Sequence, residues 1–341
     1  MSKRYGGYTA SFTTAAGTIK HFPQLQNVNV SLNMSSSMVR PMGRTEPQAF
    51  VNSQGTPSVT FQTRDIKTVL DAVPLMSGKQ CIDDAGAAAG AVFRYQKRSD
   101  YGTFDTGAVH WSLTSAQGYL FIESIEADSS SADGVVANLT YIPLTKTGVD
   151  DPFVITDDVN LSATELNPDF VSLYYPGPIY TGNGGTGTTY LGPTNRISIN
   201  PGLNFAPELE DGYTWPRVGV LRTRDPAFDV SFVKGNVVSD LFSGGTGSLT
   251  GNPHGGSYSE STEAVTVFLR KGSKTTAAGR EAIGDEKHIA IEVDSTYIQV
   301  PSWNVSGEDD VNTTISVRGA GNASSSIFSW YTDVEFPEIP A

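Results

Sequence analysis

The stretch "SVTFQTRDIKTVLDAV", residues 58–73, changes its hydrophobic period in the middle. Val59 and Phe61 alternate with polar neighbours, as on a half-buried strand. From Ile66 onward an apolar residue recurs every three or four positions, which places these residues on one face of a helix. Asp65 stands just before that run, where a helix N-cap is expected. The stretch therefore predicts a strand that leads directly into a short helix.

The same plan returns 171 residues later, at "DVSFVKGNVVSDLFSG". The two stretches align without a gap, with Phe61 over Phe232 and Asn236 at the N-cap position. Three flanking matches keep the same order: "VNVS" at residue 28 with "ISIN" at 197, "AVFRYQKRS" at 91 with "AVTVFLRKGS" at 264, and "GYLFIESIEADSSSADGVVANLTY" at 118 with "STYIQVPSWNVSGEDDVNTTISV" at 295. Collinear matches of this kind predict a tandem duplication with loop insertions.

Each copy is predicted to contain strands, then a strand with a short helix, then further strands that close in a hairpin around an acidic turn. The first domain is expected over residues 1–150 and the second over residues 169–341, with an exposed acidic linker over 151–168. Two glycine-rich segments of the second copy, 174–195 and 242–261, are expected at the surface, or ordered only where a neighbouring subunit covers them, because they hold little apolar surface to bury.

Composition supports a mainly β chain and excludes several functional classes. The 341 residues include 35 Gly and 19 Pro with 17% charged residues, a mixture typical of short strands and many turns. The net charge of −13 offers no basic field for tight binding of nucleic acid. Cys81 is the only cysteine, so no disulfide can form within the chain. We expect neither a secretory signal nor a membrane-spanning segment.

No residue pattern predicts catalysis, a cofactor or a metal ion. The pattern Gly182-x-Gly184-x-x-Gly187 lacks the strand and the helix that dinucleotide binding requires. Acidic pairs such as Asp150-Asp151 lack the spacing of a regular calcium loop, although irregular calcium sites stay open. The four histidines stand apart at His21, His110, His254 and His288. We therefore expect no enzyme, and a structural role for the two strand histidines, which hold comparable places in the two copies.

One segment carries a family resemblance. "FPQLQNVNVSLNMSSSMVRPMGRTEP", residues 22–47, resembles the beginning of bacteriophage tail tube proteins, in which an alternating strand precedes a polar loop with an arginine and a glycine, here within residues 39–44. The hairpin "ESIEADSSSADGVVANLTYI", residues 123–142, also looks like the last hairpin of that family. The resemblance covers most of residues 20–145 and is echoed over 195–318. The second copy departs from it at "PGLNFAPELEDGYTWPRVGVLRTRDP".

The resemblance implies two tandem β-sandwich or partly open barrel domains, each with one short flanking helix. It also implies a structural virion protein that self-assembles into rings, stacked into a tail tube through which DNA passes during ejection without specific binding. Three copies would give a pseudo-six-fold ring, and six copies are the alternative. The loop over residues 34–54 would contact the adjacent ring. The other partners would be tail proteins, with assembly in the host cytoplasm and no cofactor or membrane.

Two other functions are compatible with the sequence. The first is a different virion part, such as a capsid decoration, tail terminator or baseplate protein. The second is an extracellular carbohydrate-binding or adhesion module, in which exposed aromatic residues would form a sugar-binding face. The candidates for that face are Tyr174, Tyr175, Tyr180, Tyr190, Trp215, Trp303 and Trp330.

Overall fold

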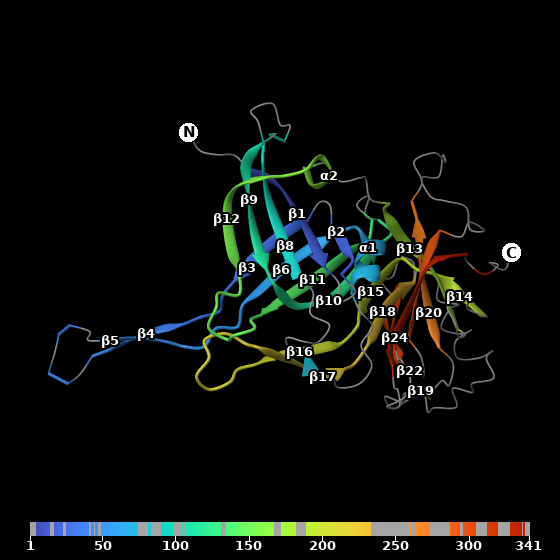
Figure 1. Ribbon diagram of the computed structural model, residues 1–341. Helices are drawn as coiled ribbons and strands as arrows, with labels where there is room; N and C mark the ends of the chain where they lie inside the picture. Colours follow the sequence, from blue (N-terminus) through green and yellow to red (C-terminus); the bar gives the residue numbers. More distant parts are fainter. Residues whose placement is uncertain are drawn as a thin grey trace.

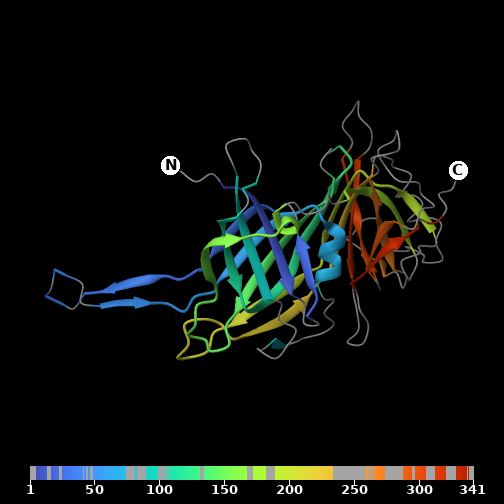
Figure 2. The ribbon, with the colours of Figure 1, turned by 45° about the horizontal axis from the view of Figure 1, so that its top comes forward.

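The computed structural model is mainly β and is built from antiparallel sheets (Figures 1 and 2). It describes residues 5–13, 17–22, 25–40, 42–43, 45–46, 49–73, 81–82, 90–98, 104–105, 107–130, 134–166, 172–181, 189–232, 259–260, 264–272, 287–293, 296–304, 312–319, 328–335 and 337. Among these residues a nine-stranded sheet shares one hydrophobic core with two five-stranded sheets.

The first half of the chain contributes to the nine-stranded sheet and forms one five-stranded sheet. In the nine-stranded sheet its strands lie in the order β3 (Gln26–Ser31), β6 (Ser58–Thr63), β11 (Val136–Leu144) and β10 (Gln117–Asp128). The five-stranded sheet has the order β12 (Val154–Asn160), β9 (Ala108–Ser115), β8 (Gly90–Lys97), β1 (Tyr5–Thr13) and β2 (Ile19–Phe22). Between β3 and β6 the chain forms a separate hairpin of β4 (Ser36–Val39) and β5 (Ala49–Asn52).

The second half is arranged in the same way. Its part of the nine-stranded sheet runs β15 (Arg196–Asn200), β18 (Ala227–Phe232), β23 (Asn312–Gly319), β22 (Thr296–Asn304), with β19 (Ser259–Glu260) at the edge. The second five-stranded sheet has the order β24 (Phe328–Val334), β21 (His288–Val293), β20 (Val265–Lys271), β13 (Tyr174–Thr181) and β14 (Thr189–Pro193). The hairpin of β16 (Leu203–Glu208) and β17 (Val218–Arg224) pairs with β7 (Cys81–Ile82).

The two halves share irregularities as well as strand order. The ladder between β10 and β11 shifts between Ile122 and Ser124, and the ladder between β22 and β23 shifts at the matching place, between Gln299 and Ser302. In the five-stranded sheets, Asp158 of β12 and Asp333 of β24 both have a φ of 58°. β-Bulges and left-handed residues are placed by local geometry, so their recurrence extends the correspondence from strand order to individual positions.

The quoted stretch folds as predicted. β6 alternates between half-buried and buried residues, and the helix α1 (Ile66–Ala72) follows after a two-residue gap. The backbone N–H of Thr68 donates to Oδ1 of Asp65 at 3.2 Å, which confirms Asp65 as the N-cap. The second helix predicted after Asn236 lies outside the described residues.

The sheet corrects the sequence alignment by two residues. Val30 lies opposite Val59, whereas Ile199, its counterpart in "ISIN", lies opposite Phe228. The counterpart of Val59 is therefore Phe228, and Phe61 corresponds to Val230 rather than to Phe232. A two-residue shift keeps every side chain on the same face of a strand, so the hydrophobic pattern alone could not detect it.

Two segments expected to be connections contain strands. β13 and β14 occupy much of the glycine-rich segment 174–195, and Tyr174, Ile179 and Tyr180 are buried, so the expectation of a surface loop was wrong for these strands. The prolines of β13 are accommodated where its ladder with β20 is irregular. Residues 151–168 contain β12, an exposed edge strand that pairs with β9, and the short helix α2 (Ala163–Leu166).

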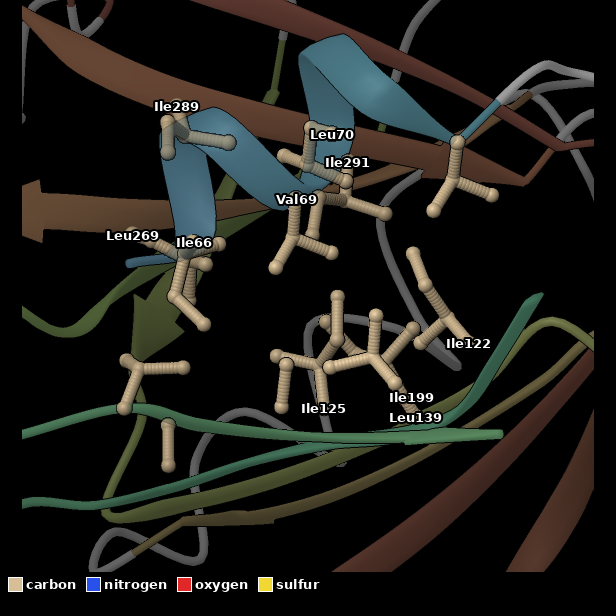
Figure 3. Packing of buried hydrophobic residues seen from close by; sticks show 14 of the residues in the cluster. Ile66, Val69, Leu70, Ile122, Ile125, Leu139, Ile199, Leu269, Ile289 and Ile291 are labelled. Atoms are coloured by element: carbon tan, nitrogen blue, oxygen red, sulfur yellow. The ribbon is translucent and has the colours of Figure 1, made fainter. Parts of the chain in front are cut away.

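Helix α1 packs where the two halves meet. Ile66, Val69 and Leu70 are buried on the face that the sequence predicted. Figure 3 shows this face beside Ile289 and Ile291 of β21, above the residues of the nine-stranded sheet. Lys67, on the outer side, forms an ion pair with Asp333 of β24 at 2.6 Å. The helix of the first half thus contacts the five-stranded sheet of the second half.

Candidate functional site

The two halves are joined edge to edge through β10 and β15. These strands pair antiparallel over four positions, with Ile125 opposite Ile199 and Glu126 opposite Ser198. The pairing makes one continuous sheet from two equivalent sets of four strands. We call this pairing the internal joint. It uses one edge of each set. The opposite edge of the first set, β3, ends the sheet, and the opposite edge of the second set, β22, is partly paired with β19.

The two outer edges of the sheet correspond to the two edges that meet at the internal joint: β3 is the counterpart of β15, and β22 is the counterpart of β10. In the described part of the chain, β3 pairs only with β6 and so presents its other edge. On the other side, β19 pairs with β22 at Tyr297 and Ile298 alone. Residues 301–304 of β22 have β23 as their only strand partner among the described residues. Exposed edges carry unpaired backbone groups and act as templates for another strand.

The edge at β3 lacks charge and proline, two of the features that usually prevent pairing between chains. Its sequence, "QNVNVS", has no charged residue and no proline. In contrast, the edges of the five-stranded sheets carry Lys20 in β2, Asp157 in β12, Asp333 in β24 and Pro193 in β14. Charges, prolines and bulges are the usual protection of an edge. β3 has one irregularity, between Gln26 and Asn29, but residues 29–31 pair regularly with β6, so this part of the edge is open to another strand.

The face of the nine-stranded sheet away from the core carries a ladder of neutral polar side chains. The amide of Asn27 donates to Gln62, Gln62 donates to Asn138 at 2.7 Å, and Asn138 donates to Ser124 at 2.7 Å. These bonds cross β3, β6, β11 and β10 in turn. Farther along, Ser231 and Thr314 are 2.9 Å apart across β18 and β23. These polar side chains satisfy one another's hydrogen-bonding groups, and none of them carries a positive charge.

Charges on this face are mixed, with acidic groups in excess among the described side chains. The carboxylates belong to Glu123, Glu126, Asp128 and Asp229, and the guanidinium groups to Arg196 and Arg318. Asp128 lies opposite Arg196 at the internal joint. Hydrogen bonds from Ser130 hold the pKa of Asp128 below its ordinary value, so this carboxylate is charged at neutral pH.

The β4–β5 hairpin, which we call the arm, projects away from the sheets (Figures 1 and 2). Every residue of β4 is exposed, and apolar Met38, Val39 and Met42 face solvent. Gly43 has a φ of 86° and so provides the left-handed position in the turn. An isolated two-stranded hairpin is at best marginally stable in water, so this segment needs a further contact surface.

The β16–β17 hairpin holds the same place in the second half but folds back onto the first half. The arm begins after Asn33 and this hairpin after Gly202, both with positive φ, 47° and 66°. Phe205 and Leu221 pack against a buried apolar cluster on β10 and β11 that includes Tyr119 and its neighbours. The remaining members of that cluster are Phe121, Ile142 and Leu144.

The tip of the folded-back hairpin is fastened at the base of the arm. Trp215 lies so close to Gly55 that a Cβ on Gly55 would clash with the indole ring. The side chain of Gln54 donates to the backbone oxygens of Glu210 and Tyr213 at 2.6 and 2.9 Å. The second hairpin is therefore held within its own chain, whereas the arm is not.

The histidines have the structural role expected of them. His110 is buried and accepts a hydrogen bond from the backbone N–H of Lys97 at 2.9 Å. His288 is also buried and accepts from the backbone N–H of Lys271 at 3.1 Å. Because Nδ1 of His110 accepts, its Nε2 carries the proton and donates to the backbone oxygen of Asp105.

The described residues contain neither a metal-ligand cluster nor a membrane-spanning helix. No three His, Cys, Asp or Glu side chains there gather as around a metal ion, and no described helix is long and apolar enough to cross a membrane. The pattern from Gly182 to Gly187 lies outside the described residues. Of the aromatic residues considered for a sugar face, Tyr174, Tyr180 and Trp215 are buried and cannot form an exposed platform.

Glu165 fastens the segment after β12 to the first five-stranded sheet. Its carboxylate lies 2.7 Å from the guanidinium of Arg94 and accepts hydrogen bonds from the backbone and hydroxyl of Ser162, at 2.9 and 2.8 Å. Burial by itself would raise the pKa of Glu165, but the Ser162 hydrogen bonds and the Arg94 charge outweigh it and lower this pKa.

Glu165→Gln is expected to lower the free energy of unfolding by about 1–3 kcal/mol at neutral pH, because it leaves the Arg94 guanidinium without its anion. A lowered folded-state pKa stabilises the fold above the unfolded-state pKa, and this contribution disappears as pH falls through the folded-state value. The difference in the free energy of unfolding between the variant and the unmodified chain should therefore shrink in acid. Urea unfolding near pH 7 and near pH 3.5 measures this difference. Glu210→Gln, at an exposed pair, should cost less than about 1 kcal/mol.

Neither a protein-family model nor a curated protein matches this chain. The features of the chain that bear on function are the edges of the nine-stranded sheet, its polar face and the arm.

Proposed function

We propose that this chain is a structural virion protein that assembles into stacked rings and forms a bacteriophage tail tube, a conduit for DNA during ejection. The internal joint carries the proposal. Two equivalent sets of strands are joined through opposite edges, and the matching edges, β3 and residues 301–304 of β22, have no second strand partner among the described residues. A head-to-tail contact of this kind closes into a ring when its rotation permits.

In this proposal each half is a tube-like β-sandwich domain, and the nine-stranded sheet is a segment of the ring wall. Ring closure would pair the remaining edges and so remove them. Three chains would give a ring with pseudo-six-fold symmetry. Six chains, with the second domain on the outside, are the alternative. The internal joint favours three, because it already places both domains in the same sheet.

The polar face of the nine-stranded sheet would line the lumen. DNA that moves through a tube must not be held, so cationic clusters would be unfavourable there. The ladder from Asn27 to Ser124 is neutral, and carboxylates exceed guanidinium groups among the described side chains of this face. The opposite face is apolar and covered by the five-stranded sheets.

The arm would reach the adjacent ring and set the stacking. Its exposed apolar side chains need a surface to cover them, and its counterpart in the second half is held down within its own chain. Each chain would therefore provide one projecting arm rather than two. A three-chain ring would present three arms to its neighbour.

Negative-stain electron microscopy of the purified, concentrated chain tests the proposed function. We expect annular particles and hollow tubes with a regular axial repeat. Isolated rings that never stack would favour a different virion part, such as a tail terminator. A chain that stays monomeric at every concentration would refute ring assembly.

A further inference from the structure

Asn304 of β22 occupies the position that Glu126 holds in β10. Glu126 lies opposite Val136 in β11, and Asn304 lies opposite Asn312 in β23. Both residues follow the bulge that the two strands share. Because Glu126 lies at the internal joint, Asn304 marks the matching position on the outer edge.

Asn29 of β3 occupies the position that Ser198 holds in β15. Asn29 lies opposite Thr60 in β6, and Ser198 lies opposite Asp229 in β18. Each stands four residues before the left-handed residue that opens the following hairpin. Since Ser198 is the partner of Glu126 in the internal joint, Asn29 is the matching position on the β3 edge.

We propose that β3 of one chain pairs antiparallel with β22 of a second copy of this chain, with Asn29 opposite Asn304 and Val30 opposite Trp303. Three chains close a ring through this contact. The proposal deepens the proposed function, on which it rests, by assigning the partner and the register of the contact between chains. The internal joint supplies the template, with Ser198 opposite Glu126 and Ile199 opposite Ile125.

The burial of the apolar residues on the two edges independently supports a further strand partner for β3. Ile197 and Ile199 of β15 are 0% exposed, because the internal joint completes their cover. Val28 and Val30, at the matching positions of β3, are only partly buried although they pack against the same core. A second chain at this edge would complete their burial, and removal of apolar surface from water favours association.

A pair of cysteines tests the register. Asn29→Cys and Asn304→Cys are introduced together in a Cys81→Ser chain, and the assembled protein is oxidised. Directly opposed residues of antiparallel strands have Cα atoms about 4.5–5.5 Å apart, within the range that a disulfide spans. We expect a non-reducing gel to show linked dimers that convert to a trimer, with no larger species, because a closed ring of three has no free cysteine left.

Two matched pairs serve as controls. Glu126→Cys with Ser198→Cys, at the internal joint, should oxidise without linking chains and shows that the geometry is suitable. Ser31→Cys with Asn304→Cys moves one cysteine about 7 Å along the strand and should link chains about tenfold more slowly.

The outcomes separate the contact from the proposed function. Absence of linked chains while the internal pair oxidises overturns the β3–β22 contact, even if tubes are seen by microscopy. Equal rates for the matched and offset pairs overturn the register. Products larger than a trimer overturn the three-chain ring. A linked trimer in a preparation that never forms tubes would leave the contact established and the tube refuted.

Discussion

Replacing residues 36–52 by a two-residue Asn-Gly turn is expected to leave ring formation intact and to abolish tubes. The cut is possible because the ends of the arm are already adjacent: the backbone N–H of Ser53 donates to the backbone oxygen of Ser35 at 2.7 Å. Asn-Gly closes such a pair as a tight hairpin turn. Because all of β4 is exposed, the deletion removes little buried surface and should leave the thermal unfolding midpoint nearly unchanged.

Sedimentation velocity and negative-stain microscopy test this deletion, and we expect them to show rings that do not stack into tubes.

A point substitution at the arm tip, Met42→Ser, should shorten the tubes, because this fully exposed side chain would be covered in the stack. The matched control is Leu209→Ser, the same kind of change at the tip of the folded-back hairpin, where 41% of the residue is exposed. It should leave tube length unchanged. Normal tubes from the arm deletion would refute the stacking role of the arm.

Local elements were predictable from the sequence because their causes are local. The alternation at Val59 and Phe61, the apolar spacing of α1 and the N-cap at Asp65 all lie within the quoted stretch, and all three are confirmed. The hairpin β10–β11 around its acidic turn is also confirmed. The repeat predicted matching strands in the second half. β15, β22 and β23 lie where it placed them, and β18 lies two residues earlier.

Long-range features were not predictable from single residues. Alternation shows that Ile125 and Ile199 face a core, but it does not show that their strands are neighbours across the internal joint. β13 was missed because its Pro176 and Gly177 are typical of loops, while the strand is stabilised by β14 and β20 on its two sides. The opposite placement of the two hairpins depends on the apolar cluster around Tyr119, which only the folded chain assembles.

Leu70→Ala is expected to be among the most destabilising single substitutions in the chain. Leu70 is 2% exposed and packs where α1 meets β21 of the second half, beside Ile291 (Figure 3). The residue thus belongs to both halves of the core, so the cavity left by its removal cannot close by a shift of the helix alone. A buried Leu→Ala change costs about 2–5 kcal/mol. Urea unfolding followed by tryptophan fluorescence measures the loss.

Lys67→Ala is the matched control for Leu70→Ala, because it introduces alanine into the same helix without removing a buried side chain. Lys67 lies on the outer side of α1, one turn before Leu70, and its substitution removes only the ion pair with Asp333, in which the two side chains are 41% and 53% exposed. Such pairs contribute at most about 1 kcal/mol. Because alanine favours a helix at both positions, any excess loss in Leu70→Ala measures burial between the halves. If the two variants unfold at the same urea concentration, burial of α1 does not stabilise the junction between the halves, which is then held by the internal joint and the folded-back β16–β17 hairpin.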